Sequence, residues 1–276
     1  MPLTEKRIAE LNELCRLQRI DTIKAIHKVQ SGHPGGTFSV MEILTVLYQE
    51  RMNVTKENVD SPERDRLVLG KGHSVPALYS NLILKGILPK DSMPTLRTMN
   101  SLLQGHPCCH TPGIDMSSGP LGMGLSAAQG IALGLRMDGI GARVYAILGD
   151  GELNEGTAWE AIQSIPKFAL SNLTAVVDHN KVQLDGTTDE ILPLRNLHEK
   201  FAAFGWNVIE CDGHDVSALN DAFDAAEAYT AGPSVIIAHT IKGKGVSFME
   251  GEAGWHGKPP CDAELAAALK ELGGAE

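Results

Sequence analysis

Polar residues and glycines follow four short apolar runs in the sequence. Gly-Asp-Gly (149–151) and Asp-His-Asn (178–180) follow two of the runs, and Asp-Gly-His-Asp (212–215) and His-Thr (239–240) follow the others. If these runs are parallel strands, the polar groups meet at one edge of a sheet, which is where open α/β sheets bind ligands. The pattern therefore predicts a phosphate or metal site at that edge.

Asp150 and Asn180 are the candidate metal ligands. Asp150 ends one apolar run, and Asn180 ends the next at the spacing of a strand–helix–strand unit. With the backbone carbonyl of Val182 they would give Mg²⁺ three oxygen ligands, leaving room for diphosphate oxygens and water. Gly151 lets the backbone approach a ligand closely, and the helix expected after it can hold an anion. Gly-Asp-Gly alone is a weak signal, because such a short motif is more often an ordinary turn, with Asn180 then a loop residue.

Periodicity predicts the elements that position these groups. Apolar residues at helical spacing indicate an amphipathic helix over 4–30, which Pro34 and its neighbouring glycines end. Loops are expected over 53–66 and 105–124. Further helices are expected over 39–50, 126–135, 156–168 and 218–229. The four apolar runs predict buried strands over 143–148, 173–177, 206–210 and 234–238. The expected fold is α/β, a parallel sheet flanked by helices on both faces, in one domain spanning 1–276.

Composition narrows the class of protein. The chain has 276 residues, 43% of them apolar, which is enough for a large core. Its formal charge of −10 argues against nucleic-acid and anionic-membrane partners. We expect a cytoplasmic protein, because the five cysteines are scattered and the first residues contain no apolar signal segment. No apolar run is long enough to span a membrane.

The ordered set of polar segments resembles transketolase, a thiamine diphosphate enzyme. The run at 149–156 (Gly-Asp-Gly-Glu-Leu-Asn-Glu-Gly) followed by 178–180 resembles the thiamine diphosphate motif. The other matching segments are Ser-Gly-His-Pro-Gly (31–35), Gly-Lys-Gly-His (70–73), Gly-His-Pro (105–107), Gly-Pro-Leu-Gly (119–122), Thr-Ile-Lys-Gly-Lys-Gly (240–245) and Trp-His-Gly (255–257). The resemblance covers about residues 5 to 262, in order, and implies the fold of the diphosphate-binding domain of that family.

The resemblance implies a role for each matching residue. Asp150, Asn180 and the Val182 carbonyl would hold Mg²⁺, with Ca²⁺ or Mn²⁺ as substitutes. The implied contacts of the cofactor are His73, Gly119, Leu121, Gly151, Glu155, Asn180, Leu184 and His256. His33, His106 and His256 are the implied catalytic residues, donating hydrogen bonds to the donor sugar and moving protons. Leu121 and Leu184 would pack on the thiazolium ring, although apolar residues are also common in a core.

The chain departs from the family pattern in three places. Met123 stands where many relatives have glutamine, and Cys108, Cys109 and His110 replace a usually acidic or apolar stretch. The sequence ends at Glu276, where a full-length transketolase continues into two more domains that carry the activating glutamate and the sugar-phosphate site. We therefore expect a separate C-terminal transketolase subunit, in an α₂β₂ heterotetramer that acts on sugar phosphates.

Several alternatives remain open. The enzyme could act on a branched, deoxy or sulfonated sugar, because the groups that read the far end of the sugar would lie in the other polypeptide. By contrast, a non-catalytic thiamine diphosphate-binding module would not need the four histidines 33, 73, 106 and 256. A zinc site built on Cys108 and Cys109 is disfavoured by their adjacency. Other thiamine enzymes fit the segments at 31–35 and 255–257 less well.

Overall fold

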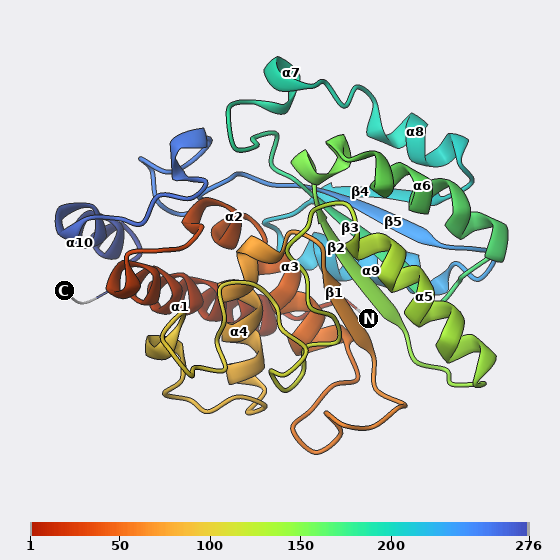
Figure 1. The fold of residues 1–276 in the computed structure, drawn as a ribbon, viewed down its shortest axis with the longest axis horizontal. Helices are drawn as coiled ribbons and strands as arrows, with labels where there is room; N and C mark the ends of the chain where they lie inside the picture. Colours follow the sequence, from red (N-terminus) through yellow and green to blue (C-terminus); the bar gives the residue numbers. More distant parts are fainter. Residues whose placement is uncertain (1, 275–276) are drawn as a thin grey trace.

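A five-stranded parallel sheet organises the chain, of which the computed structural model describes residues 2–274 (Figure 1). The strand order is β1-β2-β3-β5-β4, and each neighbouring pair runs parallel. The strands are β1 (Arg66–Leu69), β2 (Val144–Gly149), β3 (Leu173–His179), β4 (Asn207–Asp212) and β5 (Ser234–His239). The fold class predicted from the sequence is confirmed.

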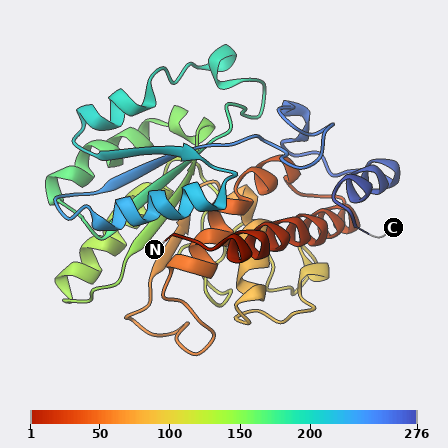
Figure 2. The ribbon, with the colours of Figure 1, turned by 180° about the vertical axis from the view of Figure 1, so that it is seen from behind.

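Helices cover both faces of the sheet because successive strand residues point to opposite sides. Tyr145 and Ile147 of β2 pack into one core, and Val144, Ala146 and Leu148 pack into the other. The first core is covered by α1 (Glu5–Val29), α3 (Met41–Val46), α4 (Val75–Leu84) and α9 (Val216–Ala228). The second is covered by α5 (Gly124–Met137), α6 (Gly156–Ser164) and α8 (Leu197–Ala203). Figures 1 and 2 show the two layers from opposite sides.

Local capping interactions determine where the first helix begins and ends. The Thr4 side chain accepts a hydrogen bond from the Arg7 N–H and caps the N-terminus of α1. Gln30, in the left-handed region at φ 49°, ends it. Pro34 then opens a second short helix, α2 (Pro34–Ser39), because proline is compatible with the first turn of a helix. The first helix therefore ends before Pro34 as expected, but α2 was missed, because the next helix was expected only from residue 39.

The remaining elements are short or lie at the ends of the chain. A π-helical turn (Leu47–Arg51) extends α3, and 3-10 turns precede or follow several helices. The last elements to place are α7 (Thr188–Ile191) and α10 (Asp262–Glu271), the latter packed against α1. The predicted strands lie within two residues of β2 to β5. The edge strand β1 was missed because it has only four residues and follows a polar loop. None of the helices between residues 2 and 274 is long and apolar enough to cross a membrane.

Candidate functional site

A crevice opens at the carboxyl ends of β1, β2 and β3, the edge that the sequence predicts. It is bounded by the ends of these strands, by α2 and by the segment that follows β5. Its lining residues are Gly36, Lys71, His73, Leu121, Gly149, Asp150, Gly151, Glu152, Asn180, Val182, Gln183, Leu184, Lys242 and His256. The crevice thus brings together all three predicted metal ligands and five of the predicted cofactor contacts other than Asn180: His73, Leu121, Gly151, Leu184 and His256.

The three predicted metal ligands are held by backbone hydrogen bonds. Asp150 is 1% exposed and accepts hydrogen bonds from the N–H groups of Gly151, at 2.7 Å, and Lys181. Asn180 Oδ1 accepts from the Val182 N–H at 3.1 Å, which fixes the loop that presents the Val182 carbonyl. Lys181, between them, adopts a left-handed conformation at φ 63°. This backbone gathers carboxylate, amide and carbonyl oxygens, the hard donors that suit Mg²⁺.

Burial makes the Asp150 carboxylate costly to ionise. It raises the pKa of Asp150 to about 7, and the neighbouring Asp178 charge adds to this rise, while the two backbone N–H groups oppose it. A carboxyl in such a place is stabilised in its charged form by a cation. The surroundings of Asp150 therefore fit a bound metal ion.

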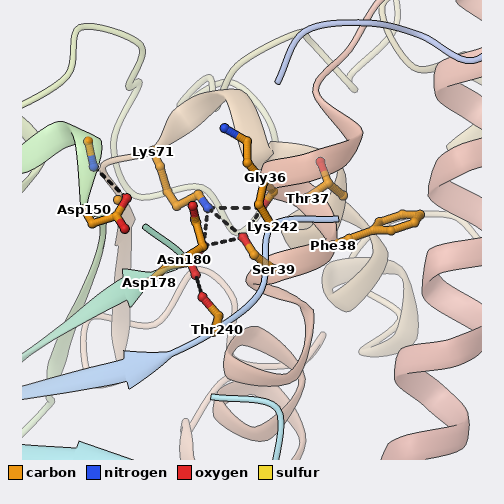
Figure 3. Close-up of polar contacts among 12 residues, drawn as sticks. Gly36, Thr37, Phe38, Ser39, Lys71, Asp150, Asp178, Asn180, Thr240 and Lys242 are labelled. Carbon is orange, nitrogen blue, oxygen red and sulfur yellow. Dashed lines mark hydrogen bonds and ion pairs between the residues drawn. The ribbon is translucent and has the colours of Figure 1, made fainter. Parts of the chain in front are cut away.

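A buried ion pair ties together the strand ends behind the crevice (Figure 3). Lys71 Nζ contacts Asp178 Oδ2 and also donates to the Gly36 carbonyl at 3.1 Å. Asp178 is fully buried and accepts further hydrogen bonds from the hydroxyls of Ser39, at 2.6 Å, and Thr240. Burial alone would raise the pKa of Asp178, but the Lys71 ammonium outweighs it and holds that pKa below its usual range. The pair joins α2, β1, β3 and β5 at one point.

Lys242 is a second buried ammonium, and it has a different set of partners. It is 2% exposed and donates to the carbonyls of Val182, at 3.0 Å, and Gln183, at 3.1 Å, and it lies 3.0 Å from His256 Nδ1. In the described part of the chain, no carboxylate lies within ion-pair distance of it. Burial lowers the Lys242 pKa to about 8, and the charge of Lys71 contributes. A buried cation with only neutral partners favours an anionic ligand.

Four histidines from distant segments form one cluster beside the crevice. The His33 ring centroid lies 5.1 Å from that of His73, 5.5 Å from that of His256 and 6.2 Å from that of His106. Burial lowers the pKa of His33 to about 4, helped by Arg97, and that of His256 to about 3, helped by Lys242. Burial also lowers the pKa values of His73 and His106. The cluster is therefore neutral near pH 7 and can both donate and accept hydrogen bonds.

The low pKa values predict how His33 and His256 titrate. Between about pH 8 and pH 5 their imidazole proton resonances should keep the shifts of neutral rings, because an unperturbed histidine titrates near 6.5. Since the unfolded chain takes up these protons first, the two residues lower folding stability as the pH falls from about 6.5 toward their folded pKa values. NMR titration, with assignments from His33→Gln and His256→Gln, measures this. A midpoint near 6.5 for either residue would contradict it.

The other predicted residues have mixed placements. Gly119 lies beside His106, since a Cβ at Gly119 would be 3.7 Å from the ring. Leu121 and Leu184 line the crevice and are exposed, Leu184 to 59%, so the alternative that they are core residues was wrong. Glu155 lies just before α6 with an exposed side chain outside the crevice lining. That placement does not support a direct contact between Glu155 and a cofactor in the crevice.

Sequence reasoning missed three charged residues of the crevice. Lys71 and Lys242 each lie next to a glycine shortly after a strand, a signal that could have marked them as anion ligands. Glu152 is 2% exposed, and its two carboxylate oxygens accept from the Gly122 N–H at 3.0 Å and the Gly149 N–H at 3.1 Å. Burial raises the Glu152 pKa to about 7. Glu152 thereby ties the loop that carries Leu121 to the end of β2.

The zinc alternative lacks the necessary ligands. Cys108 and Cys109 are free thiols in the loop after His106. Across residues 2–274, no group of three or more histidine, cysteine, aspartate or glutamate side chains is placed to bind a metal ion. The oxygen site at Asp150 is of a different kind, because two of its three ligands are an amide and a backbone carbonyl.

Comparison with known proteins identifies the family. The family described as "Transketolase, thiamine diphosphate binding domain" matches residues 11–276. The chain belongs to the transketolase family. The transketolase family is one of transferases, and its matching domain binds thiamine diphosphate. The resemblance inferred from the sequence motifs is confirmed.

Two relatives have nearly the same length as this chain. The 6-deoxy-6-sulfo-D-fructose transketolase subunit SqwG of a Clostridium species is 42% identical over 273 residues, covering 98% of each chain. The apulose-4-phosphate transketolase subunit of Phocaeicola vulgatus is 38% identical over 250 residues, covering 91% of this chain and 89% of the relative. Both relatives are named as subunits, which implies that each has a partner.

Other transketolases are much longer. Human transketolase is 38% identical over 260 residues, which are 92% of this chain but 41% of the human protein. The crystal structure of transketolase from Campylobacter jejuni superposes with a TM-score of 0.91 at 31% identity, covering 96% of this chain and 43% of that one. The chain therefore corresponds to less than half of these transketolases.

Proposed function

We propose that this chain is the N-terminal subunit of a two-subunit transketolase. It would bind thiamine diphosphate and Mg²⁺ and transfer a two-carbon ketol unit from a ketose phosphate to an aldose phosphate once a C-terminal subunit is docked. One observation carries the proposal: oxygen donors for a hard cation face the same crevice as a buried ammonium that has no carboxylate partner among the described residues. A divalent metal bound to a diphosphate matches both.

The crevice residues fit the two ends of such a ligand. Asp150, Asn180 and the Val182 carbonyl would hold Mg²⁺ against the diphosphate. A Cβ at Gly151 would lie 3.0 Å from the Gln183 side chain, so any side chain at this position would narrow the crevice where the ligand would bind. His73, His256 and Lys242 would donate to the diphosphate oxygens, since their polar groups line the crevice.

Thiamine diphosphate, when bound, supplies the electron sink that ketol transfer needs. The chain's own residues position the substrate and move protons. Neutral His33, His106 and His256 would donate to the donor sugar's carbonyl and hydroxyl oxygens and accept protons from them. His33 Nδ1 is buried and has no hydrogen-bond partner among the described residues, which leaves it free for such a role. Leu121 and Leu184 would form an apolar wall that excludes water from the reacting atoms.

A partner subunit fits a set of exposed apolar residues, of which Leu184 lines the crevice. Leu184, Ile191 and Leu192 follow β3, and Met123 precedes α5, and all are about half exposed. Exposed apolar side chains gathered around a site are typical of a protein interface. The relatives named as subunits support a partner of the C-terminal transketolase type, and we propose an α₂β₂ heterotetramer. The five free cysteines agree with a cytoplasmic location.

A second candidate function differs only in the sugar. The two relatives of nearly the same length as this chain are named for apulose-4-phosphate and 6-deoxy-6-sulfo-D-fructose, which favours an unusual branched or sulfonated sugar over a pentose phosphate pathway substrate. Met123, 52% exposed near the crevice, is the local residue that departs from the family pattern. A non-catalytic cofactor-binding module agrees less well with the cluster of four neutral histidines.

Reconstitution tests the proposed function. The purified chain alone should show no ketol transfer, because the groups that activate the cofactor would be supplied by the second polypeptide. Adding a purified C-terminal transketolase subunit from the same genome should restore turnover and produce a heteromer in size-exclusion chromatography with light scattering. A panel of ketose phosphates, branched sugar phosphates and sulfonated sugars identifies the donor. Appreciable turnover by the chain alone would contradict the two-subunit proposal.

A further inference from the structure

The carbonyl oxygen of Val182 can interact with two different cations. It is one of the three oxygens offered to the metal ion, and it accepts a hydrogen bond from Lys242 Nζ at 3.0 Å. We propose that Lys242 and the divalent metal compete for this carbonyl, and that Lys242 transfers to the diphosphate when both ligands bind. Lys242 would then couple metal binding to cofactor binding. The inference rests on the proposed function and deepens it.

The partners of Lys242 explain why it can transfer. An ammonium has three donors, and those of Lys242 are directed at two carbonyls and the Nδ1 atom of His256. All three partners are neutral, so an anionic oxygen in the crevice would be a stronger acceptor than any of them. Lys71 differs in this respect, because it is already paired with Asp178. Lys242 is thus the buried lysine of the crevice that gains most from an arriving diphosphate.

The backbone around Lys242 is fixed, so only its side chain has to move. The Lys242 carbonyl accepts from the Gly251 N–H at 2.9 Å, and the Gly243 N–H donates to the Gly35 carbonyl at 3.0 Å. On the other side, the Ile241 N–H donates to His214 Nε2 at 2.8 Å. These bonds anchor both flanks of Lys242 at the rim of the crevice. Its flexible four-carbon stem then supplies the movement.

Charge repulsion prevents the two cations from sharing the carbonyl. A carbonyl oxygen has two lone pairs, so geometry alone would allow both contacts. An ammonium and a divalent ion on the same oxygen would, however, lie only a few ångströms apart in a crevice that is largely shielded from water, where like charges repel strongly. The metal must therefore displace Lys242 or bind without the Val182 carbonyl. A bound diphosphate would relieve the conflict, because Lys242 could then donate its hydrogen bond to an anionic oxygen and leave the Val182 carbonyl to the metal.

The competition predicts opposite effects of one substitution on the two ligands. Lys242→Met removes the competitor, so the chain alone should bind Mn²⁺ about tenfold more tightly than the wild type. The same variant should bind thiamine diphosphate at saturating Mn²⁺ about tenfold or more weakly, because the diphosphate loses a charge-assisted hydrogen bond. A residue that only supports the structure of the crevice would weaken both. The gain in metal affinity is therefore diagnostic.

The experiment uses the full chain and the free metal as probe. Free Mn²⁺ is counted by electron paramagnetic resonance during titration without cofactor, and thiamine diphosphate binding is followed by calorimetry at saturating Mn²⁺. Lys244→Met is the matched control, because it removes the same charge two residues further along the chain. The Lys244 ammonium lies 3.6 Å from the Glu250 carboxylate. The affinities of this control for Mn²⁺ and for thiamine diphosphate should stay within about twofold of the wild type. Lys242→Gln keeps hydrogen-bond donors but removes the charge, so it serves as the test variant if Lys242→Met does not fold. Thermal melts of all variants check folding.

The outcomes separate this inference from the proposed function. Tighter Mn²⁺ binding with weaker cofactor binding in Lys242→Met or Lys242→Gln, and not in Lys244→Met, supports the transfer of Lys242. Unchanged or weaker Mn²⁺ binding in folded Lys242 variants overturns it while leaving the cofactor site intact. If the wild-type chain binds neither Mn²⁺ nor thiamine diphosphate, alone or with its partner, the proposed function fails and the inference fails with it.

Discussion

Replacing Asp150 with alanine is expected to abolish metal-dependent retention of thiamine diphosphate. Asp150 supplies the only charged oxygen among the three proposed metal ligands, and the two others are neutral. Loss of a group that merely supports a metal ligand typically lowers metal affinity 10–100-fold, so loss of the ligand itself should cost at least about a hundredfold. Calorimetric titration of thiamine diphosphate with and without MgCl₂ measures this, and reconstituted turnover should fall with the affinity.

Two controls isolate the metal in that experiment. Asp185→Ala removes an exposed carboxylate from the loop after Asn180 and should leave cofactor affinity unchanged. Chelation of Mg²⁺ in the wild type should reproduce the weak affinity of Asp150→Ala, whereas chelation should have little further effect on the variant. If Asp150→Ala binds the cofactor like the wild type in the presence of Mg²⁺, Asp150 does not belong to the metal site.

The sequence predicted most of the sheet because its strands are buried on both sides. Such strands appear as short continuous apolar runs, and β2 is buried at each of its residues from Val144 to Gly149. The edge strand β1 lacked this signal. Short helices such as α2 were also missed. Gly35 and Gly36 have low helix propensity, so the sequence did not predict a helix there, although packing against the rest of the chain stabilises one. Local preference decides little where tertiary contacts bury every residue, as they do in α2.

The motifs predicted which segments form the crevice but not the partners of each side chain. Lys71 and Lys242 look alike in the sequence, each beside glycine after a strand. The structure separates them: Lys71 contacts Asp178, whereas the partners of Lys242 within residues 2–274 are all neutral groups. That difference depends on which side chains lie at the neighbouring strand ends, and the spacing of residues in the sequence does not predict this. The roles of Asp178 and Glu152 were missed for the same reason.

The crevice holds cationic groups although the whole molecule is acidic. The chain carries a formal charge of −10, yet two buried ammonium groups line the crevice. Net charge acts at long range and is screened by salt, whereas buried groups act over a few ångströms with little screening. The acidic composition therefore argues against broad anionic surfaces as partners, but it does not argue against a single diphosphate. This distinction allows the composition and the proposed cofactor to agree.

Removing Asp178 is expected to cause the largest loss of folding stability of any substitution at the site. Asp178→Ala leaves the Lys71 ammonium, 2% exposed, without a counter-ion and takes an acceptor from the hydroxyls of Ser39 and Thr240. Breaking a buried pair from one side typically costs about 3–5 kcal/mol of unfolding free energy. Urea unfolding, followed by both circular dichroism and tryptophan fluorescence to test for a single transition, measures the loss.

A double-mutant cycle distinguishes the pair from its surroundings. Lys71→Met should also destabilise the chain, because it leaves the Asp178 carboxylate buried and unpaired. The double variant Lys71→Met/Asp178→Ala should lose less than the sum of the two single losses by more than about 1 kcal/mol, since no uncompensated charge remains. Glu10→Ala, which removes an exposed partner of Arg7, should cost at most about 1 kcal/mol and serves as the surface control. Additive losses at Lys71 and Asp178 would mean that the two charges do not stabilise one another. In that case the strand ends would be held by the hydroxyls and backbone groups alone.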